Sequence, residues 1–545
     1  MTGSWVRVPG KSGRGPGGDL GDIFSAWKSW VQVLNMTLAR METISASGST
    51  TGSPPARKQP RLDVVASAGT IPLIHRPSGL DCTSESLRTQ PFYKSVEWSA
   101  DGTTVIASSS ANQICTYVLP SDLLEPRDNP FELGPQNVLT LPEPTRAIAP
   151  CPYFSLGYHT TQTVLVGCKD HPLQLYSLLP EEAQATGEST SPHAEDVPCR
   201  TPPPADDPRP SSRSSASSSS SISSPTSSQT SHTSPHSPHQ RPLASYKFIK
   251  RETEGYISPS SLIWPLAPGT HFIAGATNTI AYFDASRNAE GPVLTIPTIP
   301  SARHIAKGSG VGMKGTVAAL AVQPTSDNNG GLLAAGTWTS WVGIYDLNRA
   351  GECVATWPLA GPKRGGKCSG DGGGVMQAAW SPCGRYLVLN ERRSAALAVY
   401  DVRVTGRLLA RLAGRGGEDV NQRLSCDVFP SSEAEGLFEV WAGTPDGRVL
   451  VWDRAGGDEG VVEPTWDWQA HGSGSAVGAT ALHPGGSVLA TCAGSYSVQD
   501  DGASTSESDS ESDSEPHGKK LPKLPKLRTS EDRSLKIWSI KASED

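Results

Sequence analysis

The feature that most constrains the fold is a short apolar run that ends in an aromatic residue and an acidic one, and that recurs along the chain. The clear copies end at Asp284, Asp346, Asp401 and Asp453, and degenerate copies end at Tyr117, Tyr176 and Trp538. The copies are spaced more widely than the 40 to 45 residues that one blade of a β-propeller needs, so the excess belongs to loops. Seven copies predict seven blades.

A hairpin pattern precedes most of these copies: an apolar strand, a tight turn and a second apolar strand. The turns read Ser-Ala-Asp-Gly at 99–102, Ser-Pro-Cys-Gly at 381–384 and His-Pro-Gly-Gly at 483–486. Proline presets φ in such turns and glycine tolerates a positive φ. We therefore expect an all-β fold, a seven-bladed β-propeller. The alternative is an array of β-sandwiches, which would need separate cores.

Ring closure requires one strand of the last blade to come from the opposite end of the chain, since otherwise both sheet edges stay open. The apolar stretch from Ile71 to Ile74 is the predicted closing strand. The 545 residues are long enough for one large propeller and substantial unfolded segments, and 55 Gly and 46 Pro suit many turns and few long helices. No run of 18 apolar residues occurs, so we expect no membrane span.

The chain divides into six segments on composition. A disordered extension over 1–60 holds an amphipathic stretch from Leu20 to Met41, which is either a partner-binding helix or a leader upstream of a start at Met41. The first propeller part, with the closing strand and blades 1 and 2, covers 61–180, and blades 3 to 7 cover 242–493. Between them lies a Ser/Pro-rich insertion, 181–241, which we expect to be disordered, either as a target of proline-directed kinases or as an inert spacer.

A second disordered insertion, 494–532, separates blade 7 from its last strand and the tail, 533–545. It alternates serine with acid and then turns basic from Lys519 to Arg528. Phosphorylation would add charge to the acidic block. The predicted phosphorylation sites are Ser506, Ser508, Ser510 and Ser512. The basic half is a candidate nuclear import signal or RNA contact, or simply a solvated run.

The sequence contains no catalytic signature: no phosphate-binding loop, no HExxH and no nucleophile elbow. The ten cysteines lack CxxC pairs and zinc-ligand spacing. Cys115, Cys168 and Cys492 lie in apolar strands, where we expect buried, reduced thiols. The interpretation is a protein that is not an enzyme and that uses no cofactor or metal.

The net charge of −7 argues against a nucleic-acid footprint over the whole surface, although local basic groups remain. If the ring brings them to one face, they could contact phosphates, with aromatic side chains as stacking platforms. For any single arginine the alternative is a solvated loop charge. The basic groups are Lys247, Lys250 and Arg251; Lys363, Arg364 and Lys367; Arg392 and Arg393; Arg407, Arg411 and Arg415; and Arg423, and the aromatic candidates are Tyr246, Phe248, Trp338 and Trp341.

Three blocks carry a family resemblance. The entry segment has Phe92-x-Lys94-x-x-x-Trp98-x-x-Asp101-Gly102 and a Leu119-Pro120 exit; the sixth repeat has Asn421-Gln422-Arg423, Asp427 and Gly447 to Asp453; the seventh has Leu482-His483-Pro484 before the acidic insertion. In these blocks the chain resembles the telomerase Cajal-body WD-repeat protein family, whose fungal relatives include the yeast splicing-associated WD-repeat factor. The resemblance covers roughly 90–179 and 245–540. The insertion 181–241 and the short blade-two block, Leu173 to Tyr176, depart from it.

The resemblance implies a noncatalytic nuclear scaffold for small ribonucleoproteins, acting in localisation of small Cajal-body or telomerase RNA or in pre-mRNA splicing. The expected partners are small nuclear RNA or ribonucleoprotein and further proteins, with no membrane, on a monomeric propeller. The predicted contact residues are Arg392, Arg393, Asn421, Gln422 and Arg423. The alternative is a protein-only adaptor, such as a substrate receptor of a ubiquitin ligase or a chromatin-complex subunit. An enzyme would need polar groups converging at the central channel.

Overall fold

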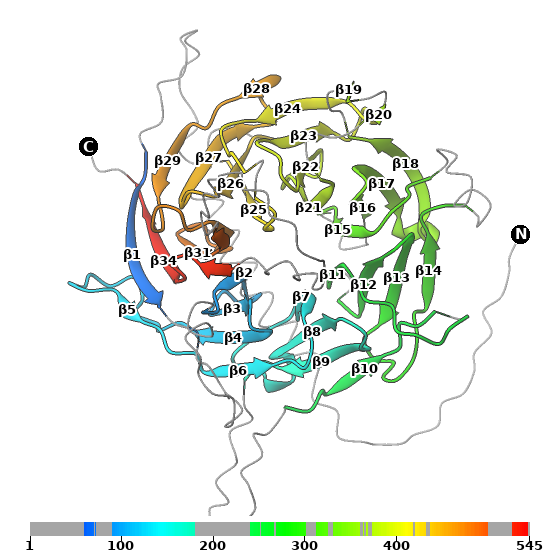
Figure 1. Cartoon of the computed structure of the whole chain (residues 1–545), viewed down its shortest axis with the longest axis horizontal. Helices are drawn as coiled ribbons and strands as arrows, with labels where there is room; N and C mark the ends of the chain where they lie inside the picture. Colours follow the sequence, from blue (N-terminus) through cyan, green and yellow to red (C-terminus); the bar gives the residue numbers. More distant parts are fainter. Residues whose placement is uncertain are drawn as a thin grey trace, which may run out of the picture. The chain divides into compact units, whose positions relative to one another are not determined.

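A computed structural model describes 59–69, 71, 90–179, 240–250, 252–265, 269–300, 312–324, 331–359, 363–364, 367–368, 373–417, 420–431, 436–499 and 526–542. Within these residues the fold is a seven-bladed β-propeller, in which seven small sheets follow one another around a central axis (Figure 1). The helical content of the described part is two 3₁₀ turns, η1 (His159–Thr161) and η2 (Leu347–Arg349). No described helix is long and apolar enough to cross a membrane.

Four blades follow one another in chain order, each with four antiparallel strands listed here from the axis outward. Blade 1 has β2 (Tyr93–Trp98), β3 (Thr104–Ser109), β4 (Gln113–Val118) and β6 (Asn137–Thr140). Blade 2 has β7 (Thr145–Pro150), β8 (Thr163–Cys168), β9 (Leu173–Ser177) and β10 (Ala244–Tyr246). Blade 3 has β11 (Ser261–Ile263), β12 (His271–Ala276), β13 (Thr279–Asp284) and β14 (Leu294–Pro297). Blade 4 has β15 (Val317–Val322), β16 (Leu332–Thr337), β17 (Trp341–Asp346) and β18 (Glu352–Pro358).

The other three blades complete the ring, and two of them carry a fifth, parallel strand on the outside. Blade 5 has β21 (Val375–Trp380), β22 (Tyr386–Glu391), β23 (Leu397–Asp401), β24 (Leu408–Leu412) and β28 (Gly460–Val462). Blade 6 has β25 (Cys426–Pro430), β26 (Phe438–Gly443), β27 (Arg448–Ala455) and β29 (Trp466–Gln469). Blade 7 has β30 (Val477–Leu482), β31 (Val488–Ala493), β34 (Leu535–Lys541), β1 (Arg61–Ala68) and β5 (Phe131–Glu132).

The aromatic-acid repeat marks the third strand of every blade, so the predicted repeat and blade count are confirmed. Asp284, Asp346 and Asp401 are the last residues of β13, β17 and β23, and Asp453 lies within β27. The acids also shape the following turn: Asp284 accepts hydrogen bonds from the amide and hydroxyl of Ser286. The repeat therefore records both the apolar packing of a third strand and the turn that ends it.

The chain's beginning closes the ring, but with a different segment from the one predicted. Strand β1 pairs antiparallel with β34 from Arg61↔Lys541 to Ala68↔Leu535. The predicted closing stretch, Ile71 to Ile74, is described only at Ile71, which is buried. The closing strand lies about ten residues earlier because the alternating pattern Leu62-Asp63-Val64 presents one apolar face to blade 6 through Leu62 and Val64.

The core consists of seven apolar clusters, and each one joins two neighbouring blades. Blades 6 and 7, for example, share a cluster containing Trp441 and Val451 on one side and Leu489 and Trp538 on the other. Blades 7 and 1 share a cluster with Ala490 and Tyr93. The remaining five clusters join blades 1–2, 2–3, 3–4, 4–5 and 5–6 in the same way. The core is thus continuous around the ring, which excludes the sandwich array with its separate cores.

Blade 7 also contains a polar network that anchors its last strand. His471, fully buried at its side chain, lies 2.8 Å from the Thr491 hydroxyl and 3.2 Å from the Asp532 carboxylate. Asp532 accepts from the amides of Gly472 and Ser534, and Trp538 donates to Thr491. The chain therefore re-enters the ring at a fixed position after the insertion.

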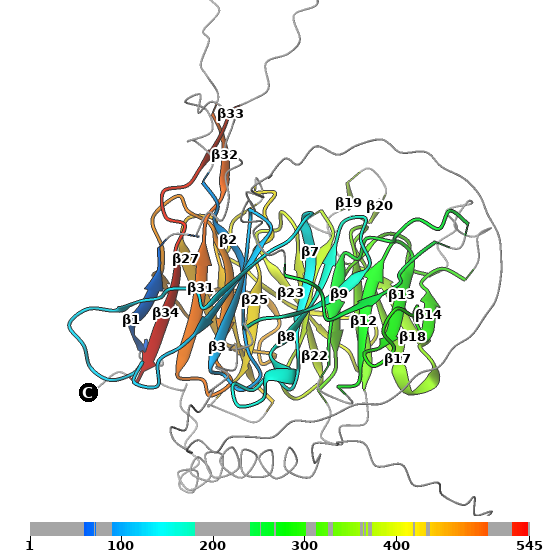
Figure 2. The ribbon, with the colours of Figure 1, turned by 90° about the horizontal axis from the view of Figure 1, so that it is seen from below.

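Two further hairpins stand apart from the blades, namely β19 (Lys363–Arg364) with β20 (Lys367–Cys368), and β32 (Tyr496–Gln499) with β33 (Lys526–Thr529) (Figure 2). The second hairpin is formed by the two ends of the predicted insertion 494–532, so its described ends are structured strands. The amphipathic stretch Leu20 to Met41, the insertion 181–239 and the predicted phosphorylation sites Ser506, Ser508, Ser510 and Ser512 lie outside the described residues.

Candidate functional site

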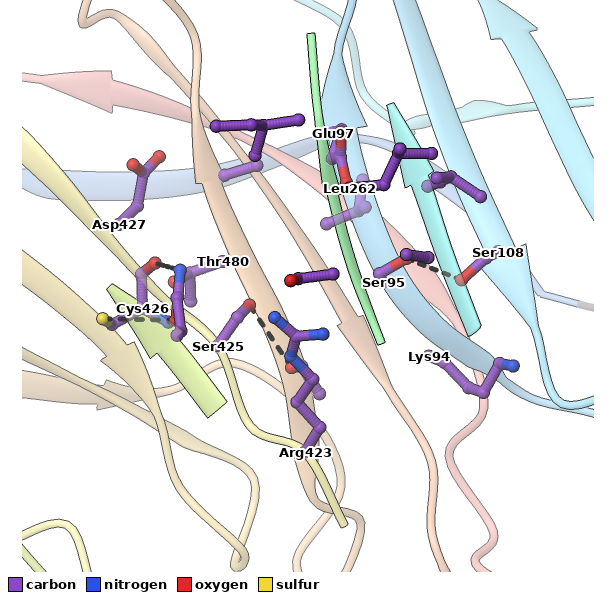
Figure 3. Close-up of a pocket in the computed structure, with 18 of the residues that line it drawn as sticks. Lys94, Ser95, Glu97, Ser108, Leu262, Arg423, Ser425, Cys426, Asp427 and Thr480 are labelled. Atoms are coloured by element: carbon purple, nitrogen blue, oxygen red, sulfur yellow. Dashed lines mark hydrogen bonds between the residues drawn. The ribbon is translucent and has the colours of Figure 1, made fainter. Parts of the chain in front are cut away.

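The innermost strands of all seven blades surround a central channel with a volume of about 660 Å³. Its wall is mixed in character: apolar groups alternate with serines, threonines and a small number of charged side chains (Figure 3). This volume lies within the range of small-ligand pockets, roughly 300 to 1,000 Å³. The channel is therefore a concave site for which the described residues supply both shape and charge.

Two sets of loops share one face of the ring, because consecutive antiparallel strands alternate in direction. One set leads into the innermost strands, and the other joins the second and third strands of each blade. We call this side the loop face. Arg392 and Arg393 lie in the turn between β22 and β23, and Asn421, Gln422 and Arg423 lie in the segment that leads into β25. All five predicted contact residues thus lie on the loop face at blades 5 and 6.

Hydrogen bonds hold this part of the loop face in place. Arg392 Nε donates to the Asn421 carbonyl at 3.0 Å, and Gln422 Nε2 donates to the Gly494 carbonyl of blade 7 at 2.7 Å. Arg392, Arg393 and Arg423 also line a hollow of about 10 Å³ beside the channel, which has room for about one water molecule. Arg392 and Gln422 are therefore partly engaged in shaping the loops.

Arg423 is the predicted residue best placed to meet a ligand. Its side chain is exposed and lines the channel, with the guanidinium directed into it (Figure 3). Among the described residues it makes no hydrogen bond and no ion pair within 4 Å, although the Glu97 carboxylate acts on it electrostatically. Although the side chain reaches solvent, the protein atoms that surround it lower the pKa of Arg423 by desolvation, and Arg423 remains a cation at neutral pH.

Two further cations at the channel were missed by the sequence interpretation. Lys94 and Arg146 line it from blades 1 and 2, and like Arg423 they make no hydrogen bond or ion pair with any described residue. Each lies at a register shift of its innermost strand, between Tyr93 and Ser95 in β2 and between Thr145 and Ala147 in β7. A β-bulge leaves one residue out of the ladder and re-aims its side chain.

The corresponding bulge positions of three other blades are uncharged. They are Ala318, Met376 and Gly478. The cations at the channel are therefore a property of blades 1, 2 and 6 and not of the repeat. No local sequence signal identifies Lys94 and Arg146, because their position at the channel depends on the bulge in each innermost strand.

Two carboxyl groups lie further along the channel. Glu97 is on β2 and Asp427 on β25 (Figure 3). Burial raises the pKa of Glu97 to about 7, an effect that Arg423 partly offsets, and burial raises the pKa of Asp427 to about 6. Asp427 already accepts from the amides of Leu482 and Val428 at 2.6 and 2.8 Å, whereas Glu97 has no hydrogen-bond partner among the described residues.

Arg415 has a structural position rather than the predicted surface one. It is 3% exposed and donates to the Gly443 carbonyl at 3.1 Å, to Asn390 Oδ1 at 2.6 Å and to the Leu424 carbonyl at 2.5 Å. Burial lowers its pKa to about 10. Because Leu424 directly follows Arg423, this buried fork fixes the segment that carries the channel cation. The prediction of a phosphate contact at Arg415 is wrong for that reason.

Some of the other basic and aromatic candidates are buried in the core and others are exposed at the surface. Tyr246 and Phe248 are 1% and 2% exposed and pack among Phe272 and Phe283, so they cannot serve as stacking platforms. Trp338 is 43% exposed, in the turn between β16 and β17 on the loop face. Arg407 pairs with Glu459 at 2.8 Å on the outside of blade 5.

The cysteines behave as the sequence indicated. Cys115, Cys168 and Cys492 are buried free thiols, and Cys151, Cys353, Cys383 and Cys426 are free thiols as well. Burial raises the pKa of Cys115 and Cys492 to about 12 and that of Cys168 to about 11. Such thiols are protonated and inert at neutral pH, and they fill the core as small apolar groups.

Comparison with known proteins identifies distant relatives. No family model matches the chain. It is 26% identical over 184 residues to "Guanine nucleotide-binding protein negative regulator 1" of Schizosaccharomyces pombe, covering 34% of this chain and 40% of the relative. It is 27% identical over 229 residues to "Telomerase Cajal body protein 1" of Mesocricetus auratus, covering 42% and 37%, and 28% identical over 186 residues to the human protein of that name, covering 34% and 29%. The chain therefore spans less than half of each relative's length, and together with the fold these matches support a WD-repeat family without indicating a specific member.

Proposed function

We propose that this propeller is a noncatalytic nuclear scaffold that binds small nuclear or small Cajal-body-type RNA in ribonucleoprotein particles through its loop face. The observation that carries the proposal is the set of three cations at the channel, Lys94, Arg146 and Arg423, which have no partner among the described residues. Unpaired cations around a groove are the electrostatic footprint of a phosphate-binding surface. The names of the mammalian relatives support a ribonucleoprotein role and a nuclear location.

Two other residues of the loop face support RNA over a generic anion. Trp338 offers an exposed indole on which a base can stack. Arg393 has a left-handed backbone with φ of 60°, whereas the comparable turns of five other blades place short turn-forming residues at positive φ, namely Asn112, Asp170, Asn278, Ser340 and Gly447. An arginine in this conformation costs roughly 1 to 2 kcal/mol. Backbone strain of this kind is concentrated at functional sites, where the side chain contacts a ligand or partner.

Crosslinking of the full chain to RNA in cells, followed by sequencing of the bound RNA, tests the proposal. We expect enrichment of small nuclear or small Cajal-body RNA, a decrease with Arg423→Ala, and a decrease with Arg393→Asn, which suits the left-handed turn and should leave the fold intact. The matched control is Arg349→Ala, an arginine 72% exposed at its side chain in η2 on the opposite face. Equal RNA recovery from all four proteins would refute the assignment of the site.

A protein-only adaptor is the second candidate, and the fungal relative's name, a negative regulator of a guanine nucleotide-binding protein, favours it. It predicts stoichiometric protein partners that persist after nuclease treatment and no crosslinked RNA above background. The same crosslinking experiment therefore separates the two functions.

A further inference from the structure

The channel has two chemically different ends. Lys94 and Arg423 lie toward one end and Glu97 and Asp427 toward the other (Figure 3). Lys94 and Glu97 are three residues apart on β2, which corresponds to roughly 10 Å along a strand. Opposite charges thus face the same cavity without contact, since no described ion pair joins them.

The cationic end is suited to a phosphate group. Lys94, Arg146 and Arg423 line the channel from blades 1, 2 and 6, and each makes no hydrogen bond with any described residue. The surrounding protein wall lowers the pKa of Lys94 and of Arg423 by desolvation, although Arg423 still reaches solvent through the channel.

The carboxyl end is suited to amino groups. Glu97 has no hydrogen-bond donor among the described residues, and the two oxygens of Asp427 already accept from backbone amides. Carboxylates accept hydrogen bonds from the exocyclic amino groups of bases such as cytosine. Between the two ends lie the hydroxyl groups of Ser95 and Ser425, which can meet a sugar.

We infer that the channel binds one nucleotide, with its phosphate at Lys94, Arg146 and Arg423 and the amino edge of its base toward Glu97. This inference deepens the proposed function by naming the part of an RNA that enters the ring: a terminal or extruded nucleotide. A free nucleotide presents the same chemistry, and a volume of about 660 Å³ is sufficient for one such unit.

Titration of the purified full chain with defined probes tests the inference. The probes are the four nucleoside 5′-monophosphates, the matching nucleosides, inorganic pyrophosphate, and a 12-residue single-stranded RNA with and without a 5′-phosphate. We expect AMP, GMP and CMP to bind at least about tenfold more tightly than their nucleosides, than pyrophosphate and than UMP, which lacks an amino group; tenfold corresponds to one good polar contact. Equal affinity for pyrophosphate and nucleotides, or no binding of any nucleotide or RNA end, would overturn the inference.

Variants separate the two ends of the site. The double variant Arg146→Ala/Arg423→Ala should lose at least about tenfold in nucleotide affinity, while Glu97→Gln should change the order of preference among bases and leave pyrophosphate binding unchanged. Arg349→Ala should match the parent, and each variant is compared at an unchanged unfolding midpoint, with Arg146→Lys/Arg423→Lys as a milder replacement. Nucleotide affinity that is unchanged in the double variant would reject the channel as the site.

The source of the nucleotide follows from the same data. Preference for RNA carrying a 5′-phosphate indicates a strand end, equal binding of both RNAs with competition by monophosphates indicates an extruded nucleotide, and binding of monophosphates alone indicates a free nucleotide. In that last case the channel inference stands and the proposed RNA scaffold fails. If RNA binding survives in the channel variants and nucleotides do not compete with it, the proposed RNA scaffold stands and the channel inference fails.

Discussion

Replacing the buried Arg415 should destabilise the ring and loosen the segment that holds the channel cation. Its guanidinium donates to three oxygens, on β22, on β26 and on the segment before β25. Hydrogen bonds from a charged donor contribute about 1.5 to 3 kcal/mol each, and the three are not independent. They therefore stabilise the fold by roughly 4 to 8 kcal/mol in total.

Burial of the charge offsets part of this stabilisation. The pKa of Arg415 is lowered from 12.5 to about 10, which corresponds to a cost of about 3 kcal/mol for keeping the charged form in the interior. Methionine at this position retains an apolar stem and needs no hydrogen bonds. We therefore expect Arg415→Met to lower the free energy of unfolding by about 1 to 5 kcal/mol, and Arg415→Lys to have a smaller effect because lysine keeps the charge without the planar fork.

Urea unfolding followed by tryptophan fluorescence measures this difference from the midpoint and the slope. Arg349→Met, at an exposed position on the opposite face, should stay within about 0.5 kcal/mol of the parent. RNA binding at a temperature where Arg415→Met remains folded should fall, because the carbonyl of Leu424 loses one of its two donors, Arg415, and keeps only Asn390. A change in unfolding free energy below about 1 kcal/mol would refute the reasoning, since it would mean that the three bonds do no more than offset the buried charge.

Two further predictions concern titratable groups. Burial opposes ionisation of Asp532, but its contacts with His471, Ser534 and Gly472 prevail and hold its pKa below the ordinary value. The stability that the Asp532 carboxylate contributes is therefore present above the unfolded pKa near 3.8 and is lost as the pH falls. Asp532→Ala should lower the free energy of unfolding at pH 7 by about 2 to 4 kcal/mol, as measured by urea unfolding against the exposed control Asp458→Ala. Glu97 has its pKa raised from 4.5 to about 7, so the folded state binds the extra proton and stability should decrease as the pH rises from about 4.5 to 7. In Glu97→Gln, the decrease in the free energy of unfolding between pH 4.5 and 7 should be smaller by about 1 to 2 kcal/mol, after allowance for solvent in the channel. An unchanged decrease over this pH range would show that Glu97 is not the group responsible.

The blades were predictable because each is encoded locally. A third strand such as β17 needs an apolar run followed by a turn-forming acid, and both lie within six residues, Trp341 to Asp346. The sequence predicted that a strand from elsewhere in the chain closes the ring, but not which strand. The need for a strand from the other end follows from the open edge of blade 7, but its identity depends on the register Arg61↔Lys541, which involves residues at opposite ends of the chain.

The channel was only partly predictable because its residues belong to different blades. Arg423 was predicted because the block Asn421-Gln422-Arg423 carries the family resemblance and because it is one of the local basic groups. Lys94 and Arg146 each stand alone beside apolar residues, and no local pattern distinguishes them from solvated charges. They line the same channel as Arg423 because each occupies a bulge at the same level of an innermost strand. The blades supply this position repeatedly, and the side chain at each bulge contributes to the charge of the channel while the core clusters between blades remain unchanged. A propeller can thus acquire a binding site through substitutions that leave its packing intact, which explains why the fold of this chain follows from its repeats whereas its site does not.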